Sequence, residues 1–313
     1  MTRRTGPMHQ AELTAADFLA LFGRLKGESA WGAADRRGAL NNISAADVLT
    51  AAREVRLGRT VSLAAPLEAM VTPDNPEPCV HEMTSMPSGA PGLNFAMDRL
   101  AMNVHGNADS HIDALCHVIF DGELYNGVAA GTVTSAGAAD LSIDVARDGI
   151  VRRGVLLDIP RIRGTSWLEP GDQVSTDDLA AAERAQGLRV GQGDLLFVRV
   201  GHRHRRNTLG PWDAAKARAG LHPEALCFLA ERRVSVLGSD GNNDTAASVV
   251  DGVEFPVHAL AVNAMGLHLL DYLQFEDLLP LCEQIGRWSF LCVIAPLRLL
   301  HGTGSPVNPI AIL

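Results

Sequence analysis

The densest group of residues capable of metal and acid–base chemistry lies in segment 102–117, MNVHGNADSHIDALCH. His111 and Asp113 are two positions apart, so in an extended strand their side chains leave the same face and can bind one cation. A straight strand would hold His105 roughly 26 Å from Asp113, so only a bend could bring that imidazole in. Gly106 tolerates the backbone angles of such a bend. Because His111 and Asp113 share one face without any bend, we predict these two residues as metal ligands.

His117 stands four residues beyond Asp113 and could lie beside the cation without binding it. An imidazole that titrates near neutral pH suits general acid–base catalysis, and a bound divalent cation brings the pKa of a water to ~7. An acid–base imidazole beside a metal-activated water predicts a hydrolase, with His117 as its catalytic acid–base residue. An H-x-D pair by itself is a weak signal, since it is common in ordinary turns.

Segment 107–117, NADSHIDALCH, resembles the H-x-G-T-H-x-D-x-x-x-H signature of the cyclase-like metal-dependent hydrolases, the family of bacterial kynurenine formamidase and isatin hydrolase. Nearly the whole chain shares the resemblance, including WGAADRRGALN at 31–41, DGELYNG at 121–127, RGVLLD at 153–158 and GTGSPVNP at 302–309. The resemblance implies a mixed α/β fold, in which helices flank a barrel-like central sheet. It also implies a divalent metal cofactor, Mn²⁺ or Zn²⁺.

The metal site departs from the family pattern at two positions. Asn107 replaces the first metal histidine and Asp271 replaces the downstream glutamate. An amide oxygen is a harder ligand than an imidazole, so Asn107 as a ligand would favour Mn²⁺ or Mg²⁺ over Zn²⁺. His105 is the alternative ligand if the chain bends, and it ranks above Asp109, a further oxygen donor.

His258 and Asp271 resemble the downstream pair that completes the family's metal site. Periodicity predicts a helix over 259–270, where a single histidine is more often a core residue and an aspartate often a cap. His268 lies in the same stretch without a counterpart in the motif, so His258 is the favoured ligand.

Three residues in family-like segments, Trp31, His81 and Tyr125, are candidate substrate-binding residues. Flat side chains with a polar edge suit an aromatic or heterocyclic substrate. A basic run at 202–206, HRHRR, is typical of solvated surface.

The site as a whole predicts hydrolysis of an amide, formamide or lactam C–N bond in a small aromatic or cyclic substrate by a metal-activated water. A lactone hydrolase is the alternative on the same site, because the same water attacks an ester carbonyl. Two alternatives from other classes are a non-catalytic small-molecule binding protein with a degraded metal site and a lyase or cyclase that stabilises an enolate.

The elements that must position these residues alternate between helix and strand signals. Ser44 can cap a helix, with Asp47 adding charge in its first turn. We predict further helices over 16–25, 177–186, 223–233 and 275–285, and strands over 60–67, 154–158, 194–200, 234–237 and 289–296. The pattern indicates one mixed α/β domain over 1–313, with an N-terminal helical segment over about 1–58.

Composition limits the partners of the chain. Its 27 Lys and Arg against 36 Asp and Glu give a net charge of −9, which opposes nucleic-acid binding. The five cysteines form no CxxC pair, and no run approaches the ~18 apolar residues of a membrane span. We expect a cytoplasmic protein with reduced thiols and, by the resemblance, a homo-oligomer (dimer or tetramer).

Overall fold

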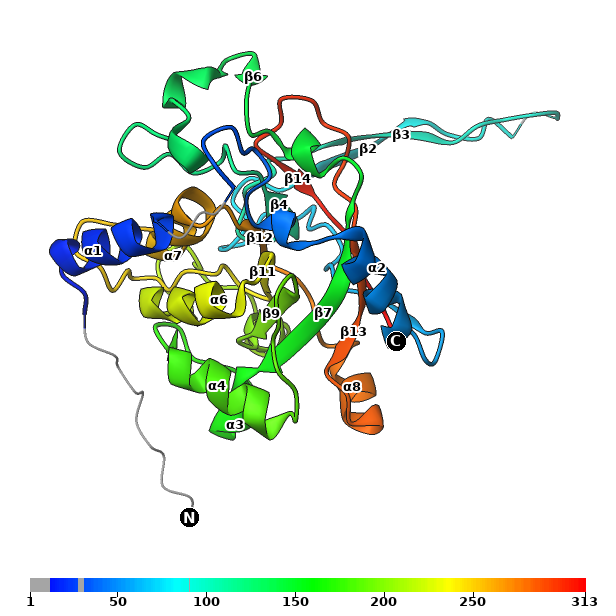
Figure 1. The fold of residues 1–313 in the computed structure, drawn as a ribbon. Coiled ribbons are helices and arrows are strands. Elements are labelled where there is room, and N and C mark those ends of the chain that lie inside the picture. The colour runs from blue at the N-terminus through cyan, green and yellow to red at the C-terminus, as the bar shows by residue number, and fades with distance from the viewer. Residues whose placement is uncertain (1–11, 28–30, 90) are drawn as a thin grey trace.

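The computed structural model describes residues 12–27, 31–89 and 91–313. Its centre is a curled sheet of nine strands in the order β1-β15-β13-β7-β9-β11-β12-β4-β14 (Figure 1). Strands β7, β9, β11 and β12 are parallel to one another, and antiparallel strands extend the sheet at both ends. Helices pack against this mixed sheet, which confirms the predicted fold class.

The nine strands are short apart from β7 at the centre. In sheet order they are β1 Thr60–Ser62, β15 Ile310–Ile312, β13 Ser289–Ile294, β7 Ile150–Asp158, β9 Leu195–Arg199, β11 Val236–Ser239, β12 His268–Asp271, β4 His111–Asp113 and β14 Gly304–Pro306. Three small two-stranded sheets pair β2 Val80–Ser85 with β3 Met97–Ala101, β5 Val133–Thr134 with β6 Gly137–Ala138, and β8 Gln173–Val174 with β10 Gly220–Leu221.

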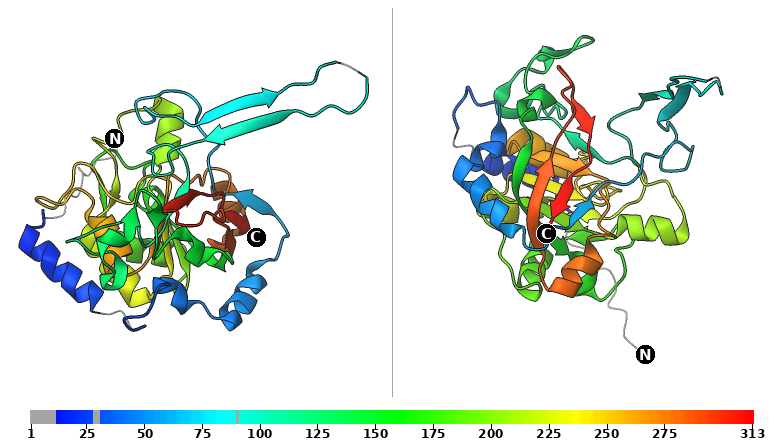
Figure 2. Two further views of the ribbon diagram at one scale, coloured as in Figure 1. Left: turned by 90° about the horizontal axis from the view of Figure 1, so that it is seen from above. Right: turned by 90° about the vertical axis from the view of Figure 1, so that its right-hand side faces the viewer.

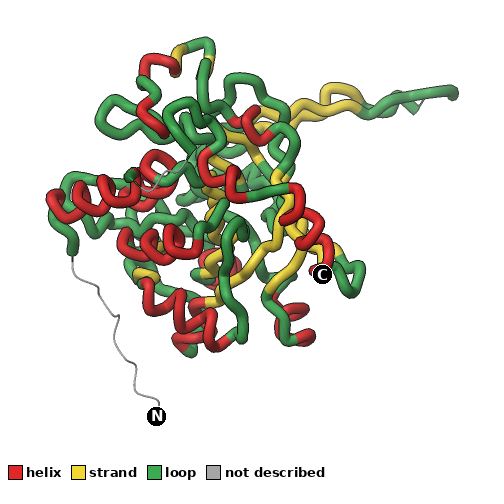
Figure 3. The backbone as a smooth tube through the Cα atoms, viewed as in Figure 1, coloured by secondary structure: helices red, strands yellow, loops and turns green. Residues whose placement is uncertain are grey.

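Loops join these strands to short helices, as Figure 3 shows. The α-helices are α1 Ala15–Lys26, α2 Ala45–Ala51, α3 Ile159–Arg163, α4 Thr176–Ala185, α5 His202–Leu209, α6 Leu226–Arg232, α7 Pro256–His258 and α8 Leu279–Ile285. Within the described ranges, no helix has the length and hydrophobicity needed to cross a membrane.

Local sequence accounts for several of these boundaries. Ser44 caps α2, because its Oγ accepts the Asp47 N–H and the Asp47 carboxylate accepts the Ser44 N–H in return. The five residues of β9 are all buried, as expected for a parallel strand covered on both faces. The predicted strand 194–200 and the predicted helix beginning at Ser44 are confirmed.

The predicted helix over 259–270 is wrong in its second half. A π-helical turn, Ala259–Ala264, follows α7, and the chain then enters β12. Gly266 ends the helical turn at φ 68°, in the left-handed region. Apolar side chains fill both the helical turn and β12, so a helical spacing of apolar residues does not by itself exclude a strand here, which explains the error.

Candidate metal centre

The candidate metal centre lies at the carboxyl ends of the parallel strands, where α/β sheets bind ligands. β12 ends at Asp271, and β4 pairs with it so that Asp271 lies opposite His111. Asp113 is two residues further along β4 and therefore shares that face. Both residues of the predicted H-x-D pair thus point to the same side of the sheet as Asp271.

The first group of ligand-type side chains comprises His105, His111 and Asp113, whose donor atoms all lie within 4.8 Å of one another. His105 Nδ1 is 2.9 Å from Asp113 Oδ1, and His111 Nε2 is 3.7 Å from the same oxygen. His111 Nδ1 donates to the Asp109 carbonyl at 2.9 Å, which directs Nε2 into the group. The chain bends between β3 and β4, so His105 reaches a carboxylate that a straight strand would hold far away.

A second group comprises Asp113, His258 and Asp271, again with donor atoms within 4.8 Å. His258 Nε2 lies 3.4 Å from Asp113 Oδ2 and 3.4 Å from Asp271 Oδ2. Asp113 belongs to both groups, so three separate stretches of the chain meet at its carboxylate.

The charge balance of these groups fits a cation. Asp113 and Asp271 are each only 1% exposed, and Asp113 Oδ2 makes no hydrogen bond within the described residues. Burial raises the pKa of Asp113, but the imidazoles of His117 and His105 outweigh burial and hold that pKa well below its ordinary value. Burial lowers the pKa of His258, whereas the carboxylates around it raise that pKa well above its ordinary value. Paired buried carboxylates with imidazole neighbours are a donor set for Zn²⁺ or Mn²⁺.

His117 lies next to the candidate metal centre, where its ring contacts the ring of His105. The two imidazole rings stack with their centroids 3.7 Å apart and their planes at 4°. Burial lowers the pKa of His117 to about 4, against an opposing effect of Asp113. The ring is therefore neutral at pH 7 and able to accept a proton.

Further residues hold His258 and Asp271, two of the candidate ligands, in place. Asp244 Oδ2 is 2.5 Å from His258 Nδ1 and also accepts the His258 backbone N–H. Asn242 and Asn243 donate side-chain N–H groups to the two oxygens of Asp271, at 2.5 and 2.6 Å. Sequence reasoning missed these residues, although the polar run DGNND at 240–244, which begins three residues after the predicted strand 234–237, is a signal for them.

The basic run 202–206 is helical, and the prediction that it is solvated surface is wrong for its first half. It forms most of α5, where His202 and Arg203 are each 4% exposed. The Arg203 guanidinium donates to the backbone carbonyls of Ala108 and Tyr272. These carbonyls belong to the two segments that carry His111 and Asp271, so the Arg203 guanidinium links these two segments by hydrogen bonds.

Asn107 and Asp109, the two other oxygen donors considered for this site, make contacts elsewhere. Asn107 accepts a hydrogen bond from the Tyr272 hydroxyl at 2.9 Å through its side-chain oxygen. The Asp109 carboxylate accepts a hydrogen bond from the Glu68 backbone N–H at 2.8 Å. His105, ranked first as the replacement ligand, is the residue that joins the cluster, while Asn107 as a ligand stays a prediction.

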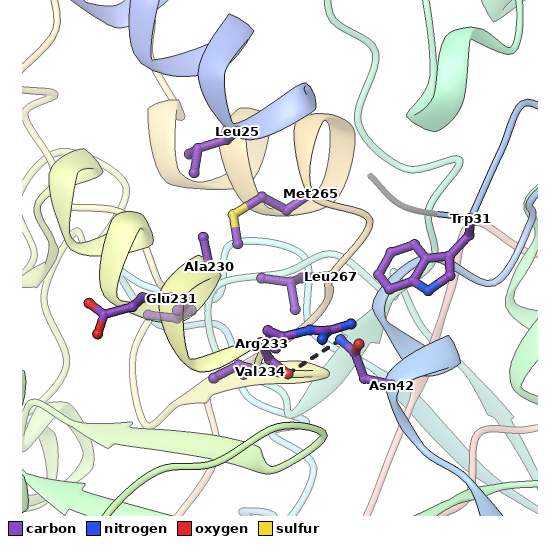
Figure 4. A pocket seen from close by; sticks show the side chains of 10 residues that line it. Leu25, Trp31, Asn42, Ala230, Glu231, Arg233, Val234, Met265 and Leu267 are labelled. Atoms are coloured by element: carbon purple, nitrogen blue, oxygen red, sulfur yellow. Dashed lines mark hydrogen bonds between the residues drawn. The ribbon is translucent and has the colours of Figure 1, made fainter. Parts of the chain in front are cut away.

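The predicted substrate residues do not surround the cluster. Tyr125 is 1% exposed and donates its hydroxyl to Asp35 at 2.9 Å. His81 lies on the exposed strand β2, 2.9 Å from Asp98. Trp31 faces a separate cavity of about 420 Å³, whose walls include Asn42 and Met265 (Figure 4). Their substrate contacts stay predictions.

Comparison with known proteins assigns the chain to a family. The model of the family described as "Putative cyclase" matches residues 60–243, more than half of the chain. The chain belongs to the cyclase family. This cyclase-family chain is 28% identical to a novel cyclase of known crystal structure, with a TM-score of 0.81 over 93% of this chain and 99% of that one. A search of curated proteins gives no significant match.

Other cyclase-fold structures are more distant. An isatin hydrolase bound to the product analogue thioisatinate is 21% identical, with a TM-score of 0.57 over 87% of this chain and 99% of that one. Isatin hydrolase A from Ralstonia solanacearum is 24% identical, with a TM-score of 0.57 over 81% and 91% of the two chains. At these identities the likeness shows the fold, and it agrees with the resemblance drawn from the sequence.

Proposed function

We propose that this chain is a metal-dependent hydrolase that cleaves an amide, formamide or lactam C–N bond in a small aromatic or cyclic substrate. The observation that carries the proposal is the meeting of two ligand groups at the buried Asp113 carboxylate. His105, His111, Asp113, His258 and Asp271 would hold the ion. Such a cation supplies a Lewis acid for the carbonyl oxygen and lowers the pKa of water.

The chain's own residues account for the proton transfers. His117 is next to the ligand groups but outside both of them, so its imidazole is available to accept a proton from the attacking water. The same ring then returns the proton to the leaving nitrogen. His105 fixes the plane of His117 by stacking, and Thr303 Oγ1, 3.0 Å from His105 Nε2, fixes His105.

An aromatic side chain borders the site and supports a flat substrate. The Phe255 ring lies 5.7 Å from the His258 ring and is 41% exposed. The buried Arg218 guanidinium lies 5.3 Å from the centroid of the same ring and holds it in place. An exposed, fixed aromatic face next to a catalytic centre suits stacking on a cyclic substrate.

The test is turnover in ¹⁸O-labelled water with a panel of N-formyl aromatic amines, lactams and lactones. We expect cleavage of an amide-type member, dependent on Mn²⁺ or Zn²⁺, with one ¹⁸O atom in the carboxylate product. Turnover of lactones alone would replace the C–N assignment by lactone hydrolysis. Product without label, or full activity in the presence of a strong chelator, would contradict the proposal.

A further inference from the structure

The cavity that Trp31 faces lies at the amino ends of β11 and β12, and the proposed hydrolysis does not use it. Its wall includes Val234, two residues before β11, and Leu267, directly before β12. These strands are parallel, with Val236 opposite His268, so the cavity lies at one end of the sheet and Asp271 at the other. At about 3.3 Å per residue, Leu267 and Asp271 are roughly 13 Å apart. None of the described residues that line the cavity belongs to either ligand group.

Most of the cavity wall is apolar. Leu25 of α1, Leu229 of α6 and Met265 line it, and the half-buried indole of Trp31 forms one side (Figure 4). The volume of about 420 Å³ is that of a site for a small molecule. An indole and a thioether both pack well on an aromatic ring. Helix α1, which borders the cavity, lies on the opposite side of the body from the projecting ribbon of β2 and β3 (Figure 2).

One polar group in the wall is a cation without a partner. The Arg233 guanidinium forms no ion pair or hydrogen bond within the described residues, whereas the neighbouring Arg232 pairs with Glu183 and Glu231. Glu231 is the acidic residue among the described lining residues, and its carboxylate points away from Arg233 (Figure 4). A guanidinium stays charged and matches the two oxygens of a carboxylate. Arg233 therefore favours a ligand with a carboxylate group.

A second polar group in the wall lacks a hydrogen-bond partner. Asn42 is only 6% exposed, and its Oδ1 accepts no hydrogen bond within the described residues. Its Nδ2 donates to the Arg233 carbonyl at 3.3 Å, which orients the amide and leaves Oδ1 as the free acceptor. A buried acceptor without a partner costs free energy, which a donor on a ligand would offset. Because Asn42 and Arg233 are in contact, this donor belongs close to the carboxylate of the ligand.

We propose that this cavity binds a small aromatic carboxylate that carries an N–H donor beside the carboxylate. The carboxylate pairs with Arg233, the N–H donates to Asn42 Oδ1, and the ring packs on Trp31. The chain carries −9 and has no general attraction for anions, so binding depends on Arg233. Hydrolysis of a lactam fused to an aromatic ring yields an amine and a carboxylate on one molecule. The ligand class thus includes a product of the proposed reaction, and this link alone rests on the proposed function.

Titration calorimetry of the full chain with 2-aminobenzoate tests the proposal, after dialysis against a chelator so that no metal ion offers the carboxylate another site. We expect the wild type to bind with a dissociation constant below about 1 mM. Arg233→Gln should raise this constant at least about tenfold, because the charge-assisted pair is lost. Arg56→Gln is the matched control, since Arg56 is also exposed and lies outside the cavity. Two further probes, 2-aminobenzamide without the charge and benzoate without the N–H donor, should each bind the wild type more weakly.

Folding is monitored separately, by far-ultraviolet circular dichroism and the thermal unfolding midpoint, which Arg233→Gln should leave unchanged because this side chain is exposed. A wild type that binds no 2-aminobenzoate up to about 5 mM, or an Arg233→Gln variant that binds it as tightly as the wild type, would overturn the proposal. So would equal weakening in the control, or either of the two further probes binding as tightly as 2-aminobenzoate. No turnover is measured, so this result is independent of the test of the proposed hydrolysis.

Discussion

The two carboxylate oxygens of Asp113 face different groups of candidate ligands. Oδ1 lies near His105 and His111, and Oδ2 lies 3.4 Å from His258. Loss of this carboxylate would therefore affect both groups at once, whereas loss of one imidazole would leave the other group complete. The geometry assigns Asp113 the central position and His117 a position at the edge.

At the residue scale, this difference separates metal binding from proton transfer. His117→Ala should retain the bound metal and lose about 10²–10⁴-fold in kcat, because only the acid–base group is removed. His111→Ala should lose metal as well as activity. Metal analysis by mass spectrometry and steady-state kinetics on the same samples provide the test. Equal activity of both variants and the wild type would refute the assignment.

The carboxylate behind His258 gives a second test at this scale. Asp244→Asn removes the charged acceptor of the His258 ring N–H, so we expect metal affinity to fall about 10–100-fold. Asp251→Asn, at an exposed position, is the control and should bind metal like the wild type. Titration calorimetry with Zn²⁺ or Mn²⁺ measures the difference. An unchanged affinity in Asp244→Asn would show that Asp244 does not support the site.

At the scale of elements, the site depends on the backbone fit between the 240–244 loop and β10. Leu221 donates its N–H to the Asn243 carbonyl at 2.8 Å. A Cβ at Gly220 would lie 2.3 Å from the Asp244 carbonyl carbon, too close for the loop to stay in place. The absence of a side chain at Gly220 therefore allows Asp244 to reach His258.

Gly220→Ala should accordingly lower the free energy of unfolding by about 1–3 kcal/mol and weaken metal binding. In the matched control, Gly131→Ala, the new methyl group meets nothing within 4 Å, so the change should stay within about 0.5 kcal/mol. Urea denaturation measures both. Equal stability and metal affinity in the two variants would contradict this role of Gly220.

How much the sequence predicts depends on how local each interaction is. The pairing of His111 with Asp113 on one face follows from strand geometry, and the structure places both on β4. Strands with clear boundaries, such as 194–200, were also predictable. The place of His105 depends on a bend, whose direction no local rule gives.

Interactions between distant segments were harder to predict. That Asp271 lies opposite His111 depends on β12 pairing with β4, which family resemblance could suggest but periodicity could not. The role of Arg203 depends on two backbone carbonyls far away in sequence. The pairing of β2 with β3 was not predicted, because these two strands have no sustained alternation of apolar and polar side chains.

At the scale of the whole molecule, buried histidines make stability depend on pH. Burial lowers the pKa of His202 to about 3, with a further decrease from Arg203. In the unfolded chain a histidine takes up a proton below about pH 6.5, so between pH 6.5 and about 3 the unfolded state binds more protons. The free energy of unfolding therefore falls as the pH is lowered through this range, by about 1.4 kcal/mol per pH unit for this residue.

His202→Gln should make stability less dependent on pH between 6.5 and 4.5, because one of the protonating groups is removed. Urea denaturation at four pH values in this window gives the slope for the wild type and the variant. His268, whose pKa burial lowers to about 4, contributes in the same direction and remains in both proteins. Identical slopes would contradict the assigned state of His202.

An anomalous difference map from crystals of this protein saturated with Zn²⁺ or Mn²⁺ tests whether the Asp113 carboxylate binds a divalent metal ion. We predict the strongest peak within about 2.0–2.3 Å of an Asp113 carboxylate oxygen, with imidazole nitrogens of the two ligand groups completing its coordination. Strong peaks only at other positions, or none near Asp113 at saturating metal, would contradict metal binding by Asp113.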